Sequence, residues 1–377
     1  MLKMTDNQQR FISGFDIGRL LRPFAGLAVP AGAVIAALVV GAILLGVFGA
    51  NPLTGYRELF TGAFGGPDEL AATALKSIPL MLVGVGICIA FRTGVINIGG
   101  EGQIIMGAIL ATLVALALPD VPRPILVPLV MIAGGVGGGI WGAIPGALKA
   151  YSGVNEILST IMMNIIAGFF MSFLLEDWLI EPGAIRIQQT KRLTQNADLP
   201  ILPGGTRLHL GIVVALIVAI LAYLLLFRSS LGMRLRAVGH NPHASRASGM
   251  KVEMSITQAL AFSGACAGIA GAVLVFGSES HRLIGEGGPL AFTQSAGFNG
   301  IVTALFGGLH PLFTVLSSYL FGGMLAGGIS LQRAVQVPQA LVIALNGVVV
   351  VFVVGSLKLR TRVQRWAEGD IQMEDRA

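Results

Sequence analysis

Two apolar runs stand on either side of a glycine-rich break in residues 77–118, which read SIPLMLVGVGICIAFRTGVINIGGEGQIIMGAILATLVALAL. The break, residues 92–103, holds four glycines and the acidic residue Glu101. A run of about 14 apolar residues reaches only about 21 Å as a helix, which is less than the roughly 30 Å of a bilayer core. We therefore expect these runs to be tilted, extended or discontinuous membrane segments.

The chain as a whole has the composition of an integral membrane protein. Of its 377 residues, 54% are hydrophobic and only 12% are charged, whereas soluble domains carry about 25% charged residues. These figures exclude both a soluble and a disordered protein. We predict an all-α polytopic membrane protein of about ten helices. Six apolar segments are long enough to span a membrane: 27–49, 125–148, 157–175, 208–227, 254–276 and 339–357. Four further segments are shorter or interrupted by glycine: 77–91, 104–118, 296–309 and 312–330.

The basic residues indicate the orientation of these spans. With the N-terminus inside, 16 of the 25 Lys and Arg residues fall on the cytoplasmic side, where membrane proteins concentrate positive charge. An even number of spans then also places the C-terminus in the cytoplasm. We interpret residues 1–26 as a cytoplasmic amphipathic segment, 27–357 as the transmembrane domain and 358–377 as a cytoplasmic tail.

Ten spans divided into two sets of five imply an inverted repeat, because an odd number per set reverses the second half in the membrane. A second glycine-interrupted stretch, Ser295–Ile301, follows the seventh span as residues 92–103 follow the second. Irregular backbone at membrane depth is tolerated where protein or a water-filled cavity satisfies its polar groups. The two breaks are therefore expected to border a translocation path, with ordinary surface loops as the alternative.

Several polar side chains lie inside or beside the apolar runs. An unpaired carboxylate at Glu101 would cost several kcal/mol, so it is expected to cap a helix, to anchor the break or to contact a substrate. Asn97 and Gln103 could serve the same purposes, and Asn164 is expected to bond another helix or to face the path. Asn155 and Glu156 favour the start of a helix. Glycines at 134–146 and at 264 and 268 indicate close helix packing.

The loop at 228–253 carries the densest cytoplasmic charge. Asn241–Pro242 is typical of a helix start and Gly249 of a helix stop, which predicts a short helix outside the membrane, with an irregular loop as the alternative. His240 and His243 lack a third ligand nearby, so no metal site is predicted. Cys88 and Cys266 show no zinc or disulfide spacing and are expected to be buried apolar residues.

Three functional classes remain open at this point. No G-x-x-x-x-G-K-[ST] loop is present, so the chain cannot hydrolyse ATP through that motif. A membrane subunit driven by a separate ATPase would use the 228–253 loop for coupling. An ion-driven carrier would instead titrate Glu101, and a scaffold would carry no solute.

Four stretches carry a resemblance to a known family: Thr93–Gln103, Ala147–Asn164, Arg236–Ala247 and Gly297–Pro311. They resemble the permease subunits of bacterial ABC importers in the group of ribose, branched-chain amino acid and nucleoside permeases, closest to the nucleoside branch. The resemblance implies a multi-pass protein of the bacterial inner membrane. Its implied partners are a second, paralogous permease, cytoplasmic ATPases, an extracytoplasmic substrate-binding lipoprotein and membrane lipid, without nucleic acid.

The same resemblance implies roles for particular residues. It implies a transporter subunit with no catalytic residues and no cofactor, since its partner uses the ATP. Simple sugars, flavins and amino acids stay open as alternatives to nucleosides. The residues assigned to ATPase coupling are Gly239, Asn241, Pro242, Ala244, Ala247 and Gly249. The candidate substrate contacts, from their aromatic and amide chemistry, are Phe91, Asn97, Glu101, Asn164, Phe298 and Asn299.

Overall fold

The computed structural model describes residues 32, 35–181, 183, 187–285, 288–338, 340–345, 347–349, 351–352 and 355. The predicted segments 1–26 and 358–377 lie outside the described residues, as does part of the expected span 339–357. The chain forms two compact units, of which the larger comprises Arg57–Leu331 and the smaller combines the parts before and after it. The candidate site belongs wholly to the larger unit, which is described below.

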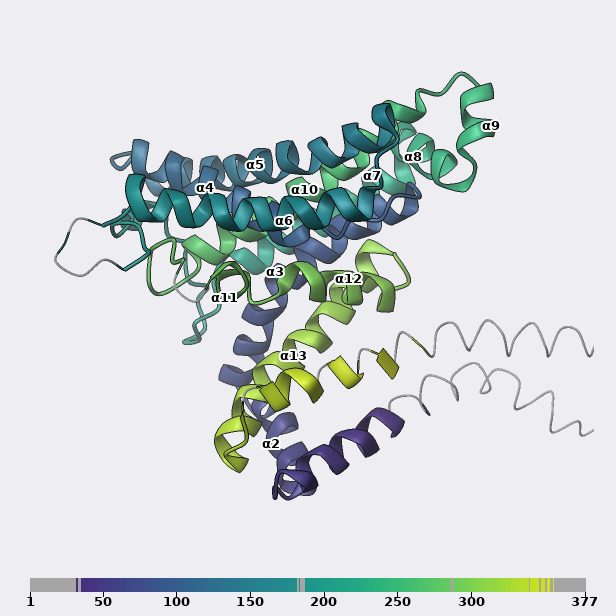
Figure 1. Cartoon of the computed structure of the whole chain (residues 1–377). Helices are drawn as coiled ribbons and strands as arrows, with labels where there is room; N and C mark the ends of the chain where they lie inside the picture. Colours follow the sequence, from purple (N-terminus) through teal and green to yellow (C-terminus); the bar gives the residue numbers. More distant parts are fainter. Residues whose placement is uncertain are drawn as a thin grey trace, which may run out of the picture. The chain divides into compact units, whose positions relative to one another are not determined.

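The described residues form helices and three isolated β-bridges, which confirms the all-α prediction. Figure 1 shows the helices in the order of the chain. They are α2 (Pro52–Phe64), α3 (Pro67–Arg92), α4 (Gly100–Ala117), α5 (Arg123–Ser152), α6 (Glu156–Phe173) with a π-helical turn (Leu174–Trp178), a 3-10 turn (Gln195–Ala197), α7 (Gly211–Arg228), α8 (Ser230–His240), α9 (Pro242–Ala247), α10 (Val252–Phe276), α11 (Pro289–Thr293), α12 (Ala296–Phe306) and α13 (Pro311–Val335).

Among the described residues, seven helices are long and apolar enough to cross a membrane, or eight if the bent pair Ile35–Val47 and Pro52–Phe64 counts as one span. The expected short segment 77–91 is part of a full span, because α3 begins at Pro67. Pro at the first turn and the acidic Asp68 and Glu69 favour that start, ahead of the apolar run. The segment 296–309, in contrast, is a helix of only 11 residues.

Close packing of glycines holds the centre of this unit together. Helix α10 packs against α3, α4 and α5, and Figure 1 shows it running along α5. A Cβ atom on Gly268 would lie 2.0 Å from the carbonyl oxygen of Gly134, and one on Gly264 would lie 2.2 Å from that of Gly138. Such contacts require glycine, because backbone atoms cannot move aside as a flexible side chain can. The packing role predicted for these glycines is confirmed.

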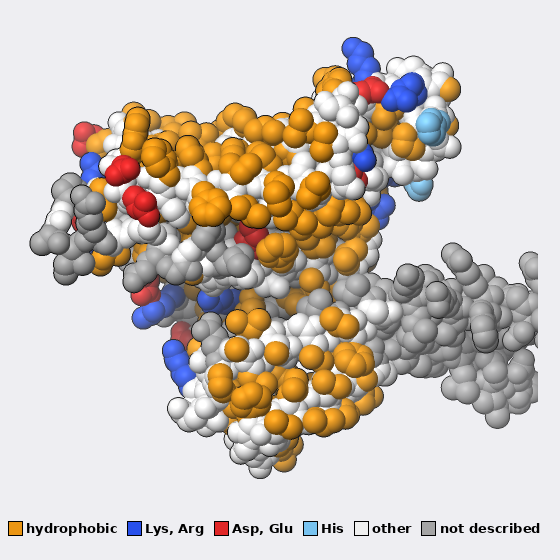
Figure 2. Space-filling model, in the orientation of Figure 1, with side chains coloured by type: hydrophobic (Ala, Val, Ile, Leu, Met, Phe, Trp, Pro, Cys, Tyr) orange, Lys and Arg blue, Asp and Glu red, His pale blue; other side chains and the backbone are white. Residues whose placement is uncertain are grey.

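The outer surface of the helices is apolar. Large hydrophobic side chains are exposed along α6 and α7, among them Phe169 at 72% and Leu221 at 57%. Figure 2 shows hydrophobic side chains over the sides of the helices, with charged side chains at both ends and His residues at the end that carries α9. This distribution is typical of a multi-pass protein whose sides contact lipid.

The start of α7 depends on a buried histidine that lies just outside the span. The amide of Gly211 donates to Nδ1 of His209 at 3.1 Å, and the ring is only 7% exposed. Burial lowers the pKa of His209, and protonation would also remove the acceptor atom. The neutral ring is therefore the form that stabilises this helix start.

Stability should consequently fall in acid. The folded pKa of His209 lies below the unfolded value of about 6.5, so this stabilisation is complete above that value and is lost as the pH falls from there through the folded pKa. We expect the melting temperature in detergent to fall between about pH 7.5 and about pH 5.5, and to fall less in His209→Asn, whose amide oxygen can still cap the helix. His240→Asn, at an exposed position, is the control. An equal fall in both variants would contradict the assignment.

Candidate translocation site and coupling helix

The two glycine-rich breaks meet at the start of α4 and the start of α12. A Cβ atom on Gly100 would lie 3.0 Å from Cα of Gly297, and one on Gly297 would lie 2.4 Å from the backbone nitrogen of Glu101. Between α11 and α12, Gln294 and Ser295 adopt left-handed backbone conformations, with φ of 52° and 58°. Non-glycine residues seldom adopt this conformation, and it is often found at functional sites.

Glu101 joins the two breaks. Its Oε1 accepts a hydrogen bond from the amide of Phe298 at 3.1 Å, and the residue is only 3% exposed. The carboxylate thus caps α12, although Glu101 itself lies in the first turn of α4. The fully buried hydroxyl of Thr293 and the backbone amide of Gly297 also lie within hydrogen-bonding reach of this carboxylate. The junction therefore surrounds Glu101 with polar groups from α11 and α12.

Residues 93–99, which we call the break segment, lead from α3 into this junction. The amide nitrogen of Asn97 donates to Oγ of Ser263 on α10 at 2.8 Å and to Oε1 of Gln103 at 2.9 Å. Its oxygen accepts from the backbone of Gly99 at 2.9 Å. Asn97 is fully buried. Its side chain therefore satisfies irregular backbone and ties the break segment to α10.

Asn164 holds the same region from α6. Its Oδ1 accepts from the amide of Gly102 at 2.8 Å, and its Nδ2 donates to the carbonyl of Ile98 at 2.9 Å. The first bond caps α4 from a neighbouring helix, which explains why α4 needs no capping side chain of its own. Of the two alternatives expected for Asn164, the structure shows the hydrogen bond to another helix, through Gly102 of α4.

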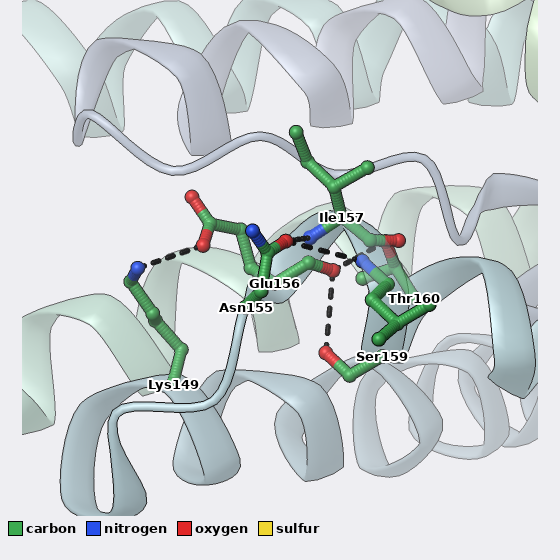
Figure 3. A network of polar contacts seen from close by, with 7 residues as sticks. Lys149, Asn155, Glu156, Ile157, Ser159 and Thr160 are labelled. Carbon is green, nitrogen blue, oxygen red and sulfur yellow. Dashed lines mark hydrogen bonds and ion pairs between the residues drawn. The ribbon is translucent and has the colours of Figure 1, made fainter.

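The turn between α5 and α6 lies against the break segment, as Figure 3 shows in close-up. Asn155 caps α6 by accepting from the amides of Ile157 and Leu158 at 2.9 and 3.2 Å. Nζ of Lys149 lies 2.8 Å from the Glu156 carboxylate, which also lies within reach of the backbone amide of Ile96. The helix start predicted at Asn155 is confirmed.

The predicted short helix in the 228–253 loop is α9. The amide of Ala244 donates to Oδ1 of Asn241 at 3.0 Å, with Pro242 at the first turn, and Gly249 ends the element with φ of 80°. Arg246 forms an ion pair with Glu253 at the start of α10. Figure 1 shows α8 and α9 at one end of the bundle. No cluster of three metal ligands occurs among the described residues, His240 and His243 included.

Helix α8 touches the break segment through glycines. A Cβ atom on Gly239 would lie 2.1 Å from the carbonyl oxygen of Arg92, and one on Gly94 would lie 3.2 Å from Cα of Gly239. Gly94 has φ of 77°, which also favours glycine. The sequence analysis placed Gly239 in the coupling loop but did not foresee this contact, because it joins residues far apart in the chain.

The aromatic and amide candidates differ in their surroundings. Phe91 packs on the buried apolar side chains of Ala90, Val95 and Leu260. Phe298 is 42% exposed at the first turn of α12. Asn299 is half-buried, and its side chain makes no hydrogen bond within the described part of the chain. Ser263 and Thr293 were missed by the sequence analysis, although a hydroxyl inside apolar α10 could have indicated Ser263.

The role of Glu101 can be separated from its charge. In Glu101→Gln one amide oxygen can still accept from Phe298, whereas Glu101→Ala leaves that buried amide without a partner. We expect the alanine variant to lose about 2 kcal/mol of stability and the glutamine variant less than half of that. Melting temperatures of both variants in detergent test this, with Glu176→Gln in the π-helical turn as a control for general loss of charge. Equal losses at position 101 would contradict a capping role.

Comparison with known proteins gives one consistent answer. Residues 70–354 match the family described as branched-chain amino acid transport system / permease component. The guanosine ABC transporter permease protein NupP of Bacillus subtilis is 36% identical over 90% of this chain and 97% of its own length. The nucleoside permease NupB of Lactococcus lactis is 30% identical over 79% of this chain and 83% of its own. The glucose permease TsgB13 of Haloferax volcanii is 29% identical over 90% of each chain.

No solved structure matches the chain. The family resemblance inferred from the four stretches is confirmed by these matches, since the family match covers residues 70–354 and so includes both breaks, α9 and most of the spans. The relatives are named as subunits of transporters and not as enzymes. The chain therefore belongs to the permease components of the branched-chain amino acid transport system family, and it is a membrane subunit of an ABC transporter.

Proposed function

We propose that this permease carries nucleosides in an ATP-driven importer. The observation that carries the proposal is the 36% identity with the guanosine permease of Bacillus subtilis, because it covers 97% of that protein. A nucleoside offers a planar base and ribose hydroxyls, which an aromatic ring and an amide can contact. Phe298 and Asn299 supply such groups beside the junction of the two breaks. The Phe298 ring is partly exposed, and the Asn299 side chain makes no hydrogen bond within the described residues.

The partners, the location and the orientation of the permease are proposed from its family. The proposed partners are cytoplasmic ATPases, a second paralogous permease and an extracytoplasmic binding lipoprotein in a bacterial inner membrane. We place α9 on the cytoplasmic side, with about ten spans in 27–357 and both termini in the cytoplasm. This orientation is supported by the sequence, because it places 16 of the 25 Lys and Arg residues on the cytoplasmic side. ATP is bound by the partner, and this chain needs no cofactor.

The proposed mechanism runs through the contacts described above. The ATPases close and move α9, and α8 presses on the break segment at Gly239. The break segment leads directly into α4, where Glu101 holds the first turn of α12. A shift at α8 therefore changes the junction of the two breaks and opens the path alternately to each side.

A simple sugar is the second candidate substrate, since the glucose permease of Haloferax volcanii is 29% identical over 90% of both chains. Flavins and amino acids stay as further alternatives. An ion-coupled carrier would require Glu101 to titrate during transport. The capping bond to Phe298 gives that carboxylate a structural role, and the family favours ATP as the energy source.

Uptake by reconstituted vesicles tests the function. Proteoliposomes containing the chain with its ATPases, second permease and binding protein should take up labelled guanosine with ATP, and competing unlabelled nucleosides should block it. ATP-dependent uptake of glucose but not of guanosine would support an ATP-driven transporter and show that its substrate is a sugar. Uptake driven by a proton or sodium gradient without ATP would overturn the proposal. Glu101→Gln should retain ATP-dependent uptake.

The substrate contacts have their own test. We expect Phe298→Ala and Asn299→Ala each to lower guanosine uptake by about tenfold, the effect of losing about 1.4 kcal/mol of stacking or hydrogen bonding. Phe169→Ala, at an exposed position on α6, should leave uptake unchanged. Wild-type uptake by both α12 variants would remove these residues from the path while leaving the substrate class open.

A further inference from the structure

Two arginines share one aromatic ring where α3 and α7 end beside α8. The guanidinium carbon of Arg92 lies 5.0 Å from the ring centroid of Phe227, and that of Arg236 lies 5.2 Å from it. The His310 ring stacks on Phe227 at 5.1 Å. We call Arg92, Phe227, Arg236 and His310 the arginine cluster.

The positive charge of this cluster is not balanced within the described residues. The other close arginine pairs of the described chain join carboxylates, at Glu181, Glu253 and Glu279. Neither arginine of the cluster has such a partner in the described part. Burial and the nearby Arg92 lower the pKa of His310, so its ring is neutral and adds no further positive charge. Two guanidinium groups beside one ring, without a carboxylate partner in the described part of the chain, favour an anion nearby.

The cluster also presents unused hydrogen-bonding atoms. Arg92 uses its Nε to donate to the carbonyl of Leu309 at 2.6 Å, which leaves its two terminal nitrogens. Nε of Arg236 and Nδ1 of His310 are buried and have no hydrogen-bond partner among the described residues. A planar guanidinium beside further donors matches the several oxygens of a phosphate group.

The surroundings indicate which phosphate compound fits. The cluster lies where three membrane helices end or begin: α3 ends at Arg92, α7 at Arg228, and α13 begins at Pro311. Phe313, whose ring lies 4.8 Å from His310, is 60% exposed, and Leu316 one turn further along α13 is 64% exposed. Charged groups at the end of a span with exposed apolar side chains beside them occupy the level of lipid headgroups.

We propose that the arginine cluster binds the phosphate of an anionic phospholipid, whose acyl chains lie along the exposed apolar side chains of α13. The shared chemistry is that of a phosphate group, and the adjoining apolar surface favours a lipid over free phosphate. Because Arg92 ends α3 directly before the break segment, a bound lipid would also brace the segment that α8 contacts. The proposal does not depend on which solute is transported.

Lipid retention tests the proposal without a transport assay. Native mass spectrometry of the full chain in detergent, with added phosphatidylglycerol, should show one lipid retained under conditions that strip phosphatidylcholine. Its affinity should fall about thirtyfold in the double variant Arg92→Gln with Arg236→Gln, and about fivefold in Arg236→Gln alone. Arg234→Gln, exposed on the same helix, should retain the lipid.

The outcomes separate the alternatives. Equal retention of phosphatidylglycerol by wild type and Arg236→Gln would overturn the proposal, and that single variant breaks no hydrogen bond of the described chain. If inorganic phosphate displaces the lipid, or raises the melting temperature while phosphatidylglycerol does not, the ligand of the cluster is free phosphate and not a lipid. Loss of lipid binding in the double variant with unchanged nucleoside uptake would support the lipid site and show that the bound lipid serves stability and not transport.

Discussion

Gly239→Ala is expected to abolish most ATP-driven uptake while leaving ATP hydrolysis by the assembled complex intact. The added Cβ would lie 2.1 Å from the carbonyl oxygen of Arg92 and 2.9 Å from the carbonyl carbon of Thr93. Because these are backbone atoms, α8 must move away from the break segment. Overpacking of this kind costs about 1–3 kcal/mol, so we expect uptake to fall by at least about tenfold. Paired measurements of uptake and hydrolysis in proteoliposomes check this result.

Gly139→Ala provides the matched control. It also adds one methyl group to a helical glycine, but its nearest neighbour would lie 3.4 Å away, which is an ordinary contact. Alanine also favours helix over glycine, so we expect normal expression and uptake. If Gly239→Ala transports as well as Gly139→Ala, the glycine contact does not transmit motion from α8. Loss of both uptake and hydrolysis would instead indicate failed assembly.

Gly268→Val is expected to prevent the protein from folding. A single Cβ there would already lie 2.0 Å from the carbonyl oxygen of Gly134 and 2.9 Å from Cα of Gly138, and valine adds two further methyl groups. Helices α5 and α10 would have to separate along their main contact, which is the largest in the unit. Membrane helices associate through such packing, since lipid supplies no hydrophobic drive.

The yield of monodisperse protein after size-exclusion chromatography measures this loss. Gly268→Val should give essentially none, whereas Gly135→Val is the partner variant. A Cβ on Gly135 would lie 3.3 Å from the flexible side chain of Ile269 and 3.7 Å from the nearest backbone atom, the carbonyl oxygen of Ala265, so we expect a reduced but measurable yield. A wild-type yield from Gly268→Val would show that the α5–α10 contact tolerates separation.

Local signals in the sequence were sufficient at several helix ends. Asn155 and Asn241 each precede a helix that they cap, as their side-chain chemistry predicts. The irregular backbone at 93–99 follows from its glycines and from Asn97. The start of α3 at Pro67 was missed, because hydropathy alone ignores a polar first turn.

Contacts between distant residues could not be read in the same way. The sequence offers a backbone amide donor at every residue except proline, so nothing marks the amide of Phe298 as the partner of Glu101. The Asn97 bond to Ser263 and the Gly239 contact with Arg92 depend equally on how the helices pack. Whether Phe298 and Asn299 contact substrate stays a prediction.

The bond between Glu101 and Phe298 has a consequence for biosynthesis. The two residues are 197 positions apart, and ribosomes add about 5–20 residues per second, so Glu101 emerges about 10–40 s before its partner. During that interval its carboxylate cannot be buried in lipid without a large cost. The N-terminal half therefore remains incompletely assembled until α12 has been synthesised and inserted. During this time Glu101 is protonated or still in contact with water.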